Sequence, residues 1–427
     1  MSELSGYKNE SLKILNNAGI SIGDLIKIIT KTTKYSGNLL PRYEYSEENY
    51  IVIKLSNGYN IGIDAKNITN IQKIMSGEKQ KFIPPEKPNV KESLPKIAIL
   101  GTGGTIASRI DYKTGAVNPA FSAEELYSII PELSAYANIN TELVSNIASE
   151  QMNPEDWKNI ANKVIEKIKE GNEGEIISHG TDTMAYTASA LSFSLQNLSK
   201  PVIFTGSQVP MSSVRSDARR NLINSVEMAT TELQEVGICF NDHVYRGNRA
   251  TKLSIGDFDA FGSPNLDPIA EIGLNIELNV EPKKLIPAFE NSAAFSNEIF
   301  VLTVHPSLSM NILDCLDLTK LKAIIVRTFG SGNFPMKGEY NMIPFFEKCR
   351  DHDVIVAIVS QADYDAVDLK KYPAGRAALK AGAIPGGDMT LEAALTKMMF
   401  LLAHSDSKEY IETQFQIPMA GELTVDK

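Results

Sequence analysis

Three short stretches of this 427-residue sequence carry the side chains that could do chemistry together. Leu100-Gly-Thr-Gly-Gly-Thr105-Ile-Ala107 and Ser178-His179-Gly180-Thr181-Asp182-Thr183-Met184 each follow an apolar run and place threonines on a turn. The third stretch is Arg249-Ala250-Thr251-Lys252, which precedes a loop rich in Gly and Asp. In open α/β sheets ligands bind where strands end in such turns, and glycines there let the backbone approach a substrate. The pattern therefore favours a ligand site at the ends of strands.

Each stretch also has a plain structural explanation. The first could be only a tight turn, Thr181 or Asp182 could cap the following helix, and a single lysine such as Lys252 is usually solvent-exposed. A dinucleotide or phosphate loop does not fit, because Ile106 stands where a third glycine would be and no Lys-Ser/Thr pair ends the loop. Two threonine loops of the same construction in one domain favour a functional site.

Alternating strands and helices must position these stretches. Asn153-Pro154 reads as a helix N-cap followed by proline, and Ser122-Ala123-Glu124-Glu125 has the form of a capping box. The alternation predicts an α/β fold with a doubly wound, mostly parallel sheet. The expected strands are Ile97–Leu100, Glu175–Ser178, Pro201–Thr205 and Val236–Asn241, and the expected helices run from Pro154 towards Gly171, over Asp182–Asn197 and over Ser216–Glu235.

A second, smaller α/β block begins near Asn297. Its expected strands are Ile299–Val304, Ala323–Arg327 and Val354–Ser360, and helices are expected near Met310–Leu316, Tyr340–Arg350, Pro373–Ala381 and Leu391–His404. Their alternation again predicts an α/β domain.

The N-terminal residues predict a small separate β-barrel or curled sheet. Ser56-Asn57-Gly58 lies between the β-rich runs Tyr50–Leu55 and Tyr59–Ile63, and Asn-Gly between two such runs is a strong hairpin signal. A further apolar run covers Leu25–Ile29, and a short helix is expected around Ser11–Asn17. The proline-rich, charged stretch Ser76–Lys96 is typical of a linker. The predicted division is a β domain over 1–75, a linker over 76–96, and α/β domains over 97–290 and 297–427.

Composition excludes several classes of protein. The net charge of −10, from 42 basic and 52 acidic residues, argues against a nucleic-acid surface spread over the whole protein. Three cysteines and five histidines are scattered without CxxC or HExxH spacing, so no built-in metal site is expected. The N-terminus has no apolar signal core, and no apolar run reaches about 18 residues. A cytoplasmic protein without a membrane span is expected.

The motifs resemble a known family. TGGTIAS, HGTDTM, TGSQVPMSSVRSDARRNL and RGNRATK are similar to the four signatures of the L-asparaginase family, and TFGSGNFP (Thr328–Pro335) and AGAIPGGDMTLEAAL (Ala381–Leu395) extend the resemblance. It implies an asparaginase-like fold and an amidohydrolase with a threonine nucleophile that cuts the side-chain amide of free glutamine or asparagine.

The N-terminal stretches GDLIKI, YSGNLLPRYE and LSNGYNIGI resemble those of the archaeal glutamyl-tRNA(Gln) amidotransferase D subunits. This resemblance implies a glutaminase that releases ammonia so that a partner subunit converts Glu-tRNA(Gln) to Gln-tRNA(Gln). From Thr205 on, TGSQVPMSSVRSD and YRGNRATKLSIGDFDAFGSPNL look more like stand-alone asparaginases. A stand-alone L-asparaginase that makes aspartate and ammonia is therefore the alternative. A third hypothesis, from another class, is an inactive scaffold or binding module.

Residue roles follow from the family resemblance. Thr105 would attack the amide carbon, and Tyr112 would assist the loss of its proton. Thr181, Asp182 and Lys252 would form a second catalytic group, in which Asp182 orients a lysine that accepts a proton. Which threonine attacks first stays open.

The same resemblance implies the substrate contacts and the assembly. Glu150 would pair with the α-ammonium group of the substrate and Ser149 with its α-carboxylate, although an exposed loop is the plain alternative. Ser108–Val117 would form a lid. No cofactor is expected on this chain, since ATP and Mg²⁺ would serve the chemistry of a tRNA-binding partner subunit. A homo-oligomer is expected, with tRNA contacted only through that partner.

Overall fold

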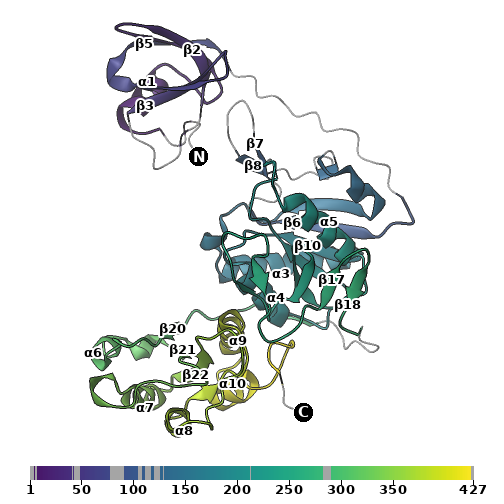
Figure 1. Cartoon of the computed structure of the whole chain (residues 1–427), viewed down its shortest axis with the longest axis vertical. Helices are drawn as coiled ribbons and strands as arrows, with labels where there is room; N and C mark the ends of the chain where they lie inside the picture. The colour runs from purple at the N-terminus through teal and green to yellow at the C-terminus, as the bar shows by residue number, and fades with distance from the viewer. Residues whose placement is uncertain are drawn as a thin grey trace. The chain divides into compact units, whose positions relative to one another are not determined.

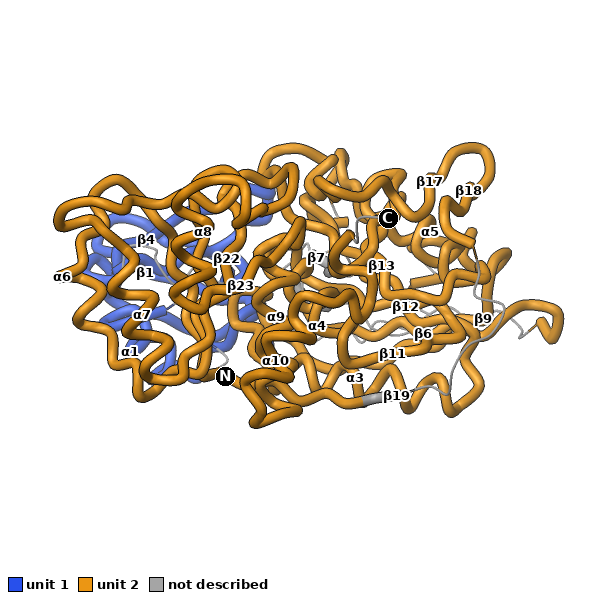
Figure 2. The backbone as a smooth tube through the Cα atoms, turned by 90° about the horizontal axis from the view of Figure 1, so that it is seen from below, with its two compact units in different colours: residues 1–85, 108–120 blue, residues 86–107, 121–427 orange. Residues whose placement is uncertain are grey.

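The structure is a computed structural model that describes residues 4, 7–40, 42, 49–76, 91–103, 108–110, 117–119, 126–127, 129–211, 213–281 and 290–424. The chain forms two compact units, coloured separately in Figure 2: residues 1–85 with 108–120, and residues 86–107 with 121–427. The predicted capping box at Ser122-Ala123-Glu124-Glu125 and most of the predicted linker lie outside the described residues.

The first unit contains a five-stranded antiparallel sheet in the order β4-β3-β2-β1-β5. In β1 (Leu25–Thr30) and β3 (Tyr50–Leu55) every second residue is buried at the start of the strand, as expected for a sheet with one face on a core. The predicted small β domain is confirmed. Its core gathers residues from the strands and from α1 (Asn9–Asn17): Leu15, Ile26, Ile28, Leu39, Ile51 and Ile53. The other elements are β2 (Lys34–Leu39), β4 (Asn60–Asp64), β5 (Ile68–Met75), the 3₁₀ turn Ala65–Asn67, and the short paired strands β7 (Ser108–Ile110) and β8 (Val117–Pro119).

Asn57-Gly58 forms the predicted turn between β3 and β4. The two strands pair from Tyr50 with Asp64 to Lys54 with Asn60, and Gly58 has a φ of +89° that suits such a turn. The apolar pattern predicts neither β2 nor β5. Since no residue of β5 is buried, this strand lacks the apolar alternation that marks a half-buried strand.

The second unit holds an eight-stranded mixed sheet in the order β18-β17-β14-β13-β12-β10-β6-β9 (Figure 1). The neighbouring strands from β9 to β13 are parallel, and β14, β17 and β18 extend the sheet with antiparallel pairing. The predicted doubly wound, mostly parallel sheet is confirmed, with an antiparallel extension that the sequence did not predict. The strands are β6 (Lys96–Gly101), β9 (Asn138–Leu143), β10 (Gly174–Ser178), β12 (Val202–Thr205), β13 (Val236–Phe240), β14 (His243–Arg246), β17 (Ala270–Ile272) and β18 (Ile276–Leu278).

Helices cover both faces of this sheet. α3 (Pro154–Lys169) and α4 (Met184–Ser194) share one core with Leu100 and Ile177. α5 (Ala218–Ala229) shares the other core with Ile99 and Ile176. Because consecutive strand residues enter different cores, both faces are buried, which is typical of a parallel sheet.

The helix boundaries have local causes. The Asn153 side chain accepts a hydrogen bond from the N–H of Glu155, and the Asp156 carboxylate accepts one from the N–H of Asn153, so α3 begins with a capping box. α5 ends at Ala229 rather than at the predicted Glu235. Thr230 and Thr231 donate their hydroxyls to the carbonyls of the preceding turn, which satisfies these carbonyls without further helix.

A four-stranded parallel sheet, in the order β20-β21-β22-β23, forms a second domain of this unit. α7 and α8 share a core with one of its faces, and α9 (Leu391–His404) and α10 (Lys408–Phe415) share a core with the other. The predicted smaller α/β domain is confirmed, but α10 was not predicted because it buries only Ile411 and Phe415. The other elements are β20 (Ile299–Thr303), β21 (Ala323–Thr328), β22 (Ile355–Ser360), β23 (Ile384–Pro385), α6 (Met310–Leu313), α7 (Ile343–Asp351) and α8 (Pro373–Lys380). Short elements elsewhere in the unit are β11 (Leu195–Gln196), β15 (Thr251–Lys252), β16 (Phe261–Gly262), β19 (Glu290–Asn291) and the 3₁₀ turns Pro131–Ala135, Ser149–Gln151, Leu318–Lys320 and Gly338–Tyr340.

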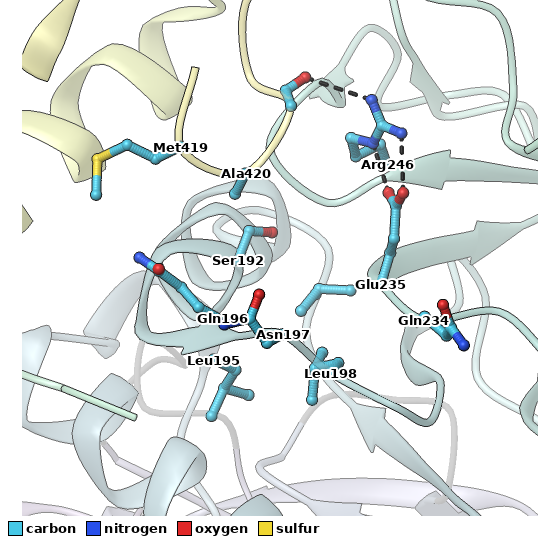
Figure 3. A pocket seen from close by; sticks show the side chains of 12 residues that line it. Ser192, Leu195, Gln196, Asn197, Leu198, Gln234, Glu235, Arg246, Met419 and Ala420 are labelled. Atoms are coloured by element: carbon cyan, nitrogen blue, oxygen red, sulfur yellow. Dashed lines mark hydrogen bonds and ion pairs between the residues drawn. The ribbon is translucent and has the colours of Figure 1, made fainter. Parts of the chain in front are cut away.

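The C-terminal tail after α10 links the two domains of the second unit. Fully buried Lys397 on α9 pairs with fully buried Glu422 at 2.5 Å. Arg246 at the end of β14 makes two hydrogen bonds to Glu235, of 2.5 and 2.9 Å, and reaches the carbonyl of Gly421 at 3.5 Å (Figure 3). The tail is therefore bonded to both domains.

Candidate active site

Three parallel strands end at one edge of the large sheet, next to one another. Gly101 of β6 pairs with Ser178 of β10, and Ser178 pairs with Thr205 of β12. The N–H and the hydroxyl of Thr102 donate to the carbonyl of Ser178 at 3.1 and 3.0 Å, and the N–H of His179 donates to the carbonyl of Thr205 at 2.9 Å. The first two motif-bearing turns thus begin side by side, at the edge where α/β sheets bind ligands.

Two glycines allow the chain to come close at these turns. Gly103 has a φ of +120°, and a Cβ there would lie 2.1 Å from the carbonyl oxygen of Ile147. A Cβ on Gly180 would lie 2.7 Å from Ser149 Oγ. Neither position accepts a side chain without movement of its neighbours. Ser149 therefore lies against the residue that precedes Thr181.

Lys252 lies between the two side chains of the second threonine turn. Its Nζ donates to Thr181 Oγ1 at 2.8 Å and to Asp182 Oδ1 at 2.6 Å, although these residues lie about 70 positions away in the sequence. The lysine side chain is 16% exposed and that of Asp182 is 63% exposed. A lysine in this place can hold a proton between a hydroxyl and a carboxylate, and in its neutral form it can accept the hydroxyl proton.

Gln208, for which the sequence suggested no role, also contacts Thr181. The Thr181 hydroxyl donates to Gln208 Oε1 at 3.3 Å. Gln208 Nε2 donates to the carbonyls of Ser254 and Asp257 at 3.3 and 3.1 Å, which fixes the orientation of its amide. The residue belongs to the motif TGSQVPMSSVRSDARRNL, but a single glutamine in a loop carries no chemical signal of its own.

Asp217 holds the loop that carries Gln208. Its carboxylate accepts the N–H groups of Gln208 and Val209 at 3.0 and 3.1 Å, and the amide of Asn221 at 3.1 Å. Buried Asn221 also donates to the carbonyl of Gly206 at 2.9 Å. The Gln208 loop is thus bonded to the start of α5, so the partner of the Thr181 hydroxyl is fixed by a helix.

His179, next to the threonine turn, is a structural residue. One ring nitrogen contacts the carbonyl of Gly180 at 2.7 Å, and the other contacts Thr187 Oγ1 at 3.0 Å. Burial lowers the pKa of His179 to about 4, so the ring is neutral at neutral pH. Because both ring nitrogens are hydrogen-bonded, the imidazole stabilises the threonine turn.

The described structure brings together Ser149, Thr181, Asp182 and Lys252 of the predicted site. Glu150 follows Ser149 and is exposed. Thr105 and Tyr112 lie outside the described residues, and the predicted lid Ser108–Val117 is described only over 108–110 and at 117.

A cavity of about 250 Å³ opens beside Lys252, at the junction of the two domains of the second unit. Thr251 and Lys252 line it together with Arg327, Thr390 and Glu392 of the C-terminal domain. Its lining is strongly polar, which suits a charged small molecule more than an apolar one.

Figure 3 shows a second cavity, of about 260 Å³, whose lining includes none of Thr181, Asp182 and Lys252. Leu198, Glu235 and Val236 line it, and they precede or begin β12 and β13. This is the amino edge of the parallel strands, whereas the threonine turns follow the carboxyl edge. The second cavity therefore lies at the edge of the sheet opposite the motif-bearing turns.

Beyond this site, the described residues form neither a metal-binding cluster nor a disulfide. No group of three or more His, Cys, Asp or Glu side chains there could hold a metal ion. Cys239, Cys315 and Cys349 are all unbridged. None of the helices in the described part of the chain has the length and apolar character needed to cross a membrane.

Family models match most of the chain. "Asparaginase, N-terminal" matches residues 96–284, and "Glutaminase/Asparaginase C-terminal domain" matches residues 298–415. "GatD N-terminal domain" matches residues 20–74. The first of these models alone contains all three motif-bearing stretches.

Curated relatives match along almost the whole length. The D subunit of the glutamyl-tRNA(Gln) amidotransferase of Pyrococcus abyssi is 38% identical over 435 residues, which covers 96% of this chain and 97% of the relative. The protein of the same name from Methanosphaera stadtmanae is 35% identical, over 98% of this chain and 96% of the relative.

Solved structures match about three quarters of the chain. The thermostable L-asparaginase from Thermococcus kodakarensis is 34% identical with a TM-score of 0.72, over 78% of this chain and all of that chain. L-asparaginase I from Vibrio cholerae is 35% identical with a TM-score of 0.69, again over 78% of this chain and all of the other.

Proposed function

The chain belongs to the asparaginase family, and on that premise we propose that it is the glutaminase subunit of a glutamyl-tRNA(Gln) amidotransferase. The observation that carries the proposal is the similarity over 96% of the chain to amidotransferase D subunits, including a GatD N-terminal domain over residues 20–74. In this role the chain hydrolyses glutamine to glutamate and ammonia, and a partner subunit uses the ammonia to convert Glu-tRNA(Gln) to Gln-tRNA(Gln).

For the amide hydrolysis, we propose two threonines. Thr105 attacks the side-chain amide carbon, and Tyr112 assists the loss of its proton. Thr181 serves the second group, in which its hydroxyl donates to Gln208 and accepts from Lys252. Backbone N–H groups of the strand-end turns are the proposed donors to the oxyanion. Support for this division is that the turns after β6 and β10 begin next to each other at one sheet edge.

Lys252 is the proposed proton carrier of the second group. In the first half of the reaction the Thr105 proton passes to the leaving nitrogen as the C–N bond breaks, so ammonia departs and an ester forms on Thr105. In the second half neutral Lys252 takes the Thr181 proton, Thr181 takes a proton from the water that attacks the ester, and the Lys252 ammonium returns a proton to Thr105. Glutamate then leaves, and both threonines and the lysine are regenerated. Asp182, 2.6 Å away, orients the amine and stabilises its charged form. The hydrogen bonds from Lys252 to Thr181 and to Asp182 support this assignment.

For the substrate, we propose that Glu150 binds the α-ammonium group and Ser149 the α-carboxylate. Support comes from the position of Ser149 against Gly180, beside the threonine turn. The choice between glutamine and asparagine depends on one methylene, which a pocket discriminates by about 1–3 kcal/mol.

The assembly is proposed from the same similarity. The partner is a tRNA-binding amidotransferase subunit, and it supplies the ATP- and Mg²⁺-dependent step, while this chain binds no cofactor. The chain also forms a homo-oligomer and reaches tRNA through the partner alone. Because a charged tRNA is the final substrate, the proposed place of action is the cytoplasm. We propose the domain division 1–75, 97–290 and 297–427, joined by a linker over 76–96.

A stand-alone L-asparaginase is the second candidate. It is favoured by the similarity of 78% of this chain to solved L-asparaginases, whose chains are covered completely. It leaves the module matched as GatD N-terminal domain without a role.

The proposed chemistry is tested with Thr105→Ala and Thr181→Ala in an ammonia-release assay on glutamine. Each variant is expected to lose ammonia release while its circular dichroism spectrum stays unchanged, because each removes a hydroxyl that the reaction needs. A matched control is Thr413→Ala, whose hydroxyl only bonds within α10 on the surface. Near-normal rates in both active-site variants would refute the threonine assignment.

A further inference from the structure

Lys252 is carried by a very short strand. β15 contains only Thr251 and Lys252, and among the described strands it pairs only with β16, through Thr251 with Gly262 and Lys252 with Phe261. A strand of this length cannot fix the position of a long side chain by its own pairing. The position of Lys252 must therefore depend on what holds the residues beside it.

Arg249, three residues before Lys252, is held by the C-terminal domain. Its Nη1 donates to Asp388 Oδ2 at 2.7 Å, and both side chains are nearly inaccessible, at 3% and 9% exposure. The same guanidinium donates to the carbonyl of Gly421 at 2.8 Å and to Thr424 Oγ1 at 3.1 Å. A buried guanidinium with three such partners is fixed in direction as well as in place.

Both carboxylate oxygens of Asp388 accept hydrogen bonds. Thr424 donates its hydroxyl to Oδ2 at 2.6 Å and its N–H to Oδ1 at 2.9 Å. Burial alone would raise the pKa of Asp388, but the hydrogen bonds from Thr424 and Arg249 outweigh it, so the pKa lies below its ordinary value. The carboxylate therefore stays charged and keeps its hold on Arg249.

Thr251, directly before Lys252, is held by a second carboxylate of the same domain. Its hydroxyl donates to Glu392 Oε1 at 2.8 Å, and Glu392 is 9% exposed in the first turn of α9. Successive side chains of an extended strand point to opposite faces. While Thr251 is bound to Glu392, Lys252 is therefore directed away from it, towards Thr181 and Asp182.

We propose that Asp388 and Glu392 are positioning residues for Lys252. The two residues lie four positions apart at the start of α9. Asp388 holds Arg249 and Glu392 holds Thr251, and both held residues belong to the stretch that carries the lysine. The second domain thereby sets where the amine meets the Thr181 hydroxyl. This inference rests on the proposed function, in which Lys252 is the proton carrier.

The test compares Asp388→Asn, Thr251→Val and Thr251→Ser with Lys252→Met in the full chain, with glutamine as substrate. Asp388→Asn and Thr251→Val are expected to lower kcat by about 10- to 100-fold, because a small misplacement of a catalytic group costs that much. For Asp388→Asn, KM stays within about 2-fold, since Asp388 does not line the cavity beside Lys252. Thr251→Ser keeps the hydroxyl and restores most of kcat, which a purely apolar packing role would not explain.

Glu142→Gln is the matched control. It neutralises a carboxylate that pairs with Lys163 and Lys167 in the first domain of the unit, away from Lys252. Unchanged kcat in both Asp388→Asn and Thr251→Val, beside an inactive Lys252→Met, would overturn the positioning role and leave the proposed function intact. A Lys252→Met variant with a near-normal rate would instead overturn the proton-carrier assignment. If Asp388→Asn fails to fold, the Thr251 pair still decides the question.

Discussion

Two lysine–carboxylate pairs in the second unit have nearly the same length and different surroundings. Lys252 lies 2.6 Å from Asp182, and Lys397 lies 2.5 Å from Glu422. The first pair is open to solvent on the side of Asp182, which is 63% exposed, whereas both members of the second pair are fully buried. The two pairs therefore differ in their exposure to solvent and not in the distance between lysine and carboxylate.

The hydrogen bonds around each amine show the difference. Lys397 donates to the carbonyls of Phe415 and Ile417 as well as to Glu422, so all three N–H groups of its ammonium are used by fixed acceptors inside the fold. Lys252 instead contacts the Thr181 hydroxyl, which can give up a proton to it. The Lys397–Glu422 pair, whose ammonium has no hydrogen bond left to give, holds the C-terminal tail in place. The Lys252–Asp182 pair, which also contacts a hydroxyl, is suited to proton transfer.

The largest effect is expected from Lys252→Met. Loss of the proposed proton carrier should lower the rate of ammonia release by about 10²–10⁴-fold, while the melting temperature hardly changes. Steady-state assays and thermal melts measure both, and Lys163→Met, which removes a lysine outside the site, serves as control. A large fall in melting temperature would mean that this pair, like the buried one, is structural.

Lys397→Met should show the opposite profile. It leaves Glu422 buried without its partner, which costs about 3–5 kcal/mol in the free energy of unfolding. Denaturant unfolding measures the loss. The double variant Lys397→Met/Glu422→Leu should regain most of it, because no uncompensated charge remains buried. Equal losses in the single and double variants would contradict this explanation.

Glu175 is a third case, a buried carboxylate without a lysine. It is fully buried on β10, and neither oxygen has a hydrogen-bond partner among the described residues. Burial raises its pKa from 4.5 to about 8. A carboxyl with a raised folded-state pKa costs no stability below the unfolded value, and destabilises the fold progressively as pH rises from about 4.5 to 8.

Glu175→Gln should therefore stabilise the protein at pH 8.5 by about a few kcal/mol and leave its stability at pH 4.5 nearly unchanged. Thermal melts of the variant and the native protein across this pH range measure the difference. A stabilisation that does not depend on pH would show that the charge of Glu175 is not its cause.

The smallest effect is expected at a solvent-exposed polar group. Asn153→Ala removes the side chain that caps α3 and should cost about 1 kcal/mol of stability. Asn153→Ser, which keeps a capping oxygen, should cost much less. A loss as large as that of Lys397→Met would mean that exposure does not separate the two kinds of interaction.

The sequence predicted much of the fold because apolar periodicity and helix caps are local signals. α9 was predicted over its full length, and α3 was predicted from its cap. β5 and α10 were not predicted, because β5 buries no residue and α10 buries only two. The antiparallel strands β14, β17 and β18 are too short to show a period.

The site was predicted in part, because motif residues lie at strand ends. Thr181, Asp182 and Lys252 meet, and Ser149 lies beside them, as the family resemblance implied. Gln208, Asp388 and Glu392 carry no signal in the sequence, because what singles each one out is a contact with a residue distant in sequence. Only folding brings Glu392 to Thr251, 141 positions away.

The most direct test of the central claim is ammonia release by the purified chain from glutamine and from asparagine. Each substrate is assayed alone and with an amidotransferase partner subunit, Glu-tRNA(Gln), ATP and Mg²⁺. The account predicts weak basal activity that rises on glutamine when the partner and the charged tRNA are present. Strong activity on asparagine that ignores the partner would contradict it and identify a stand-alone asparaginase.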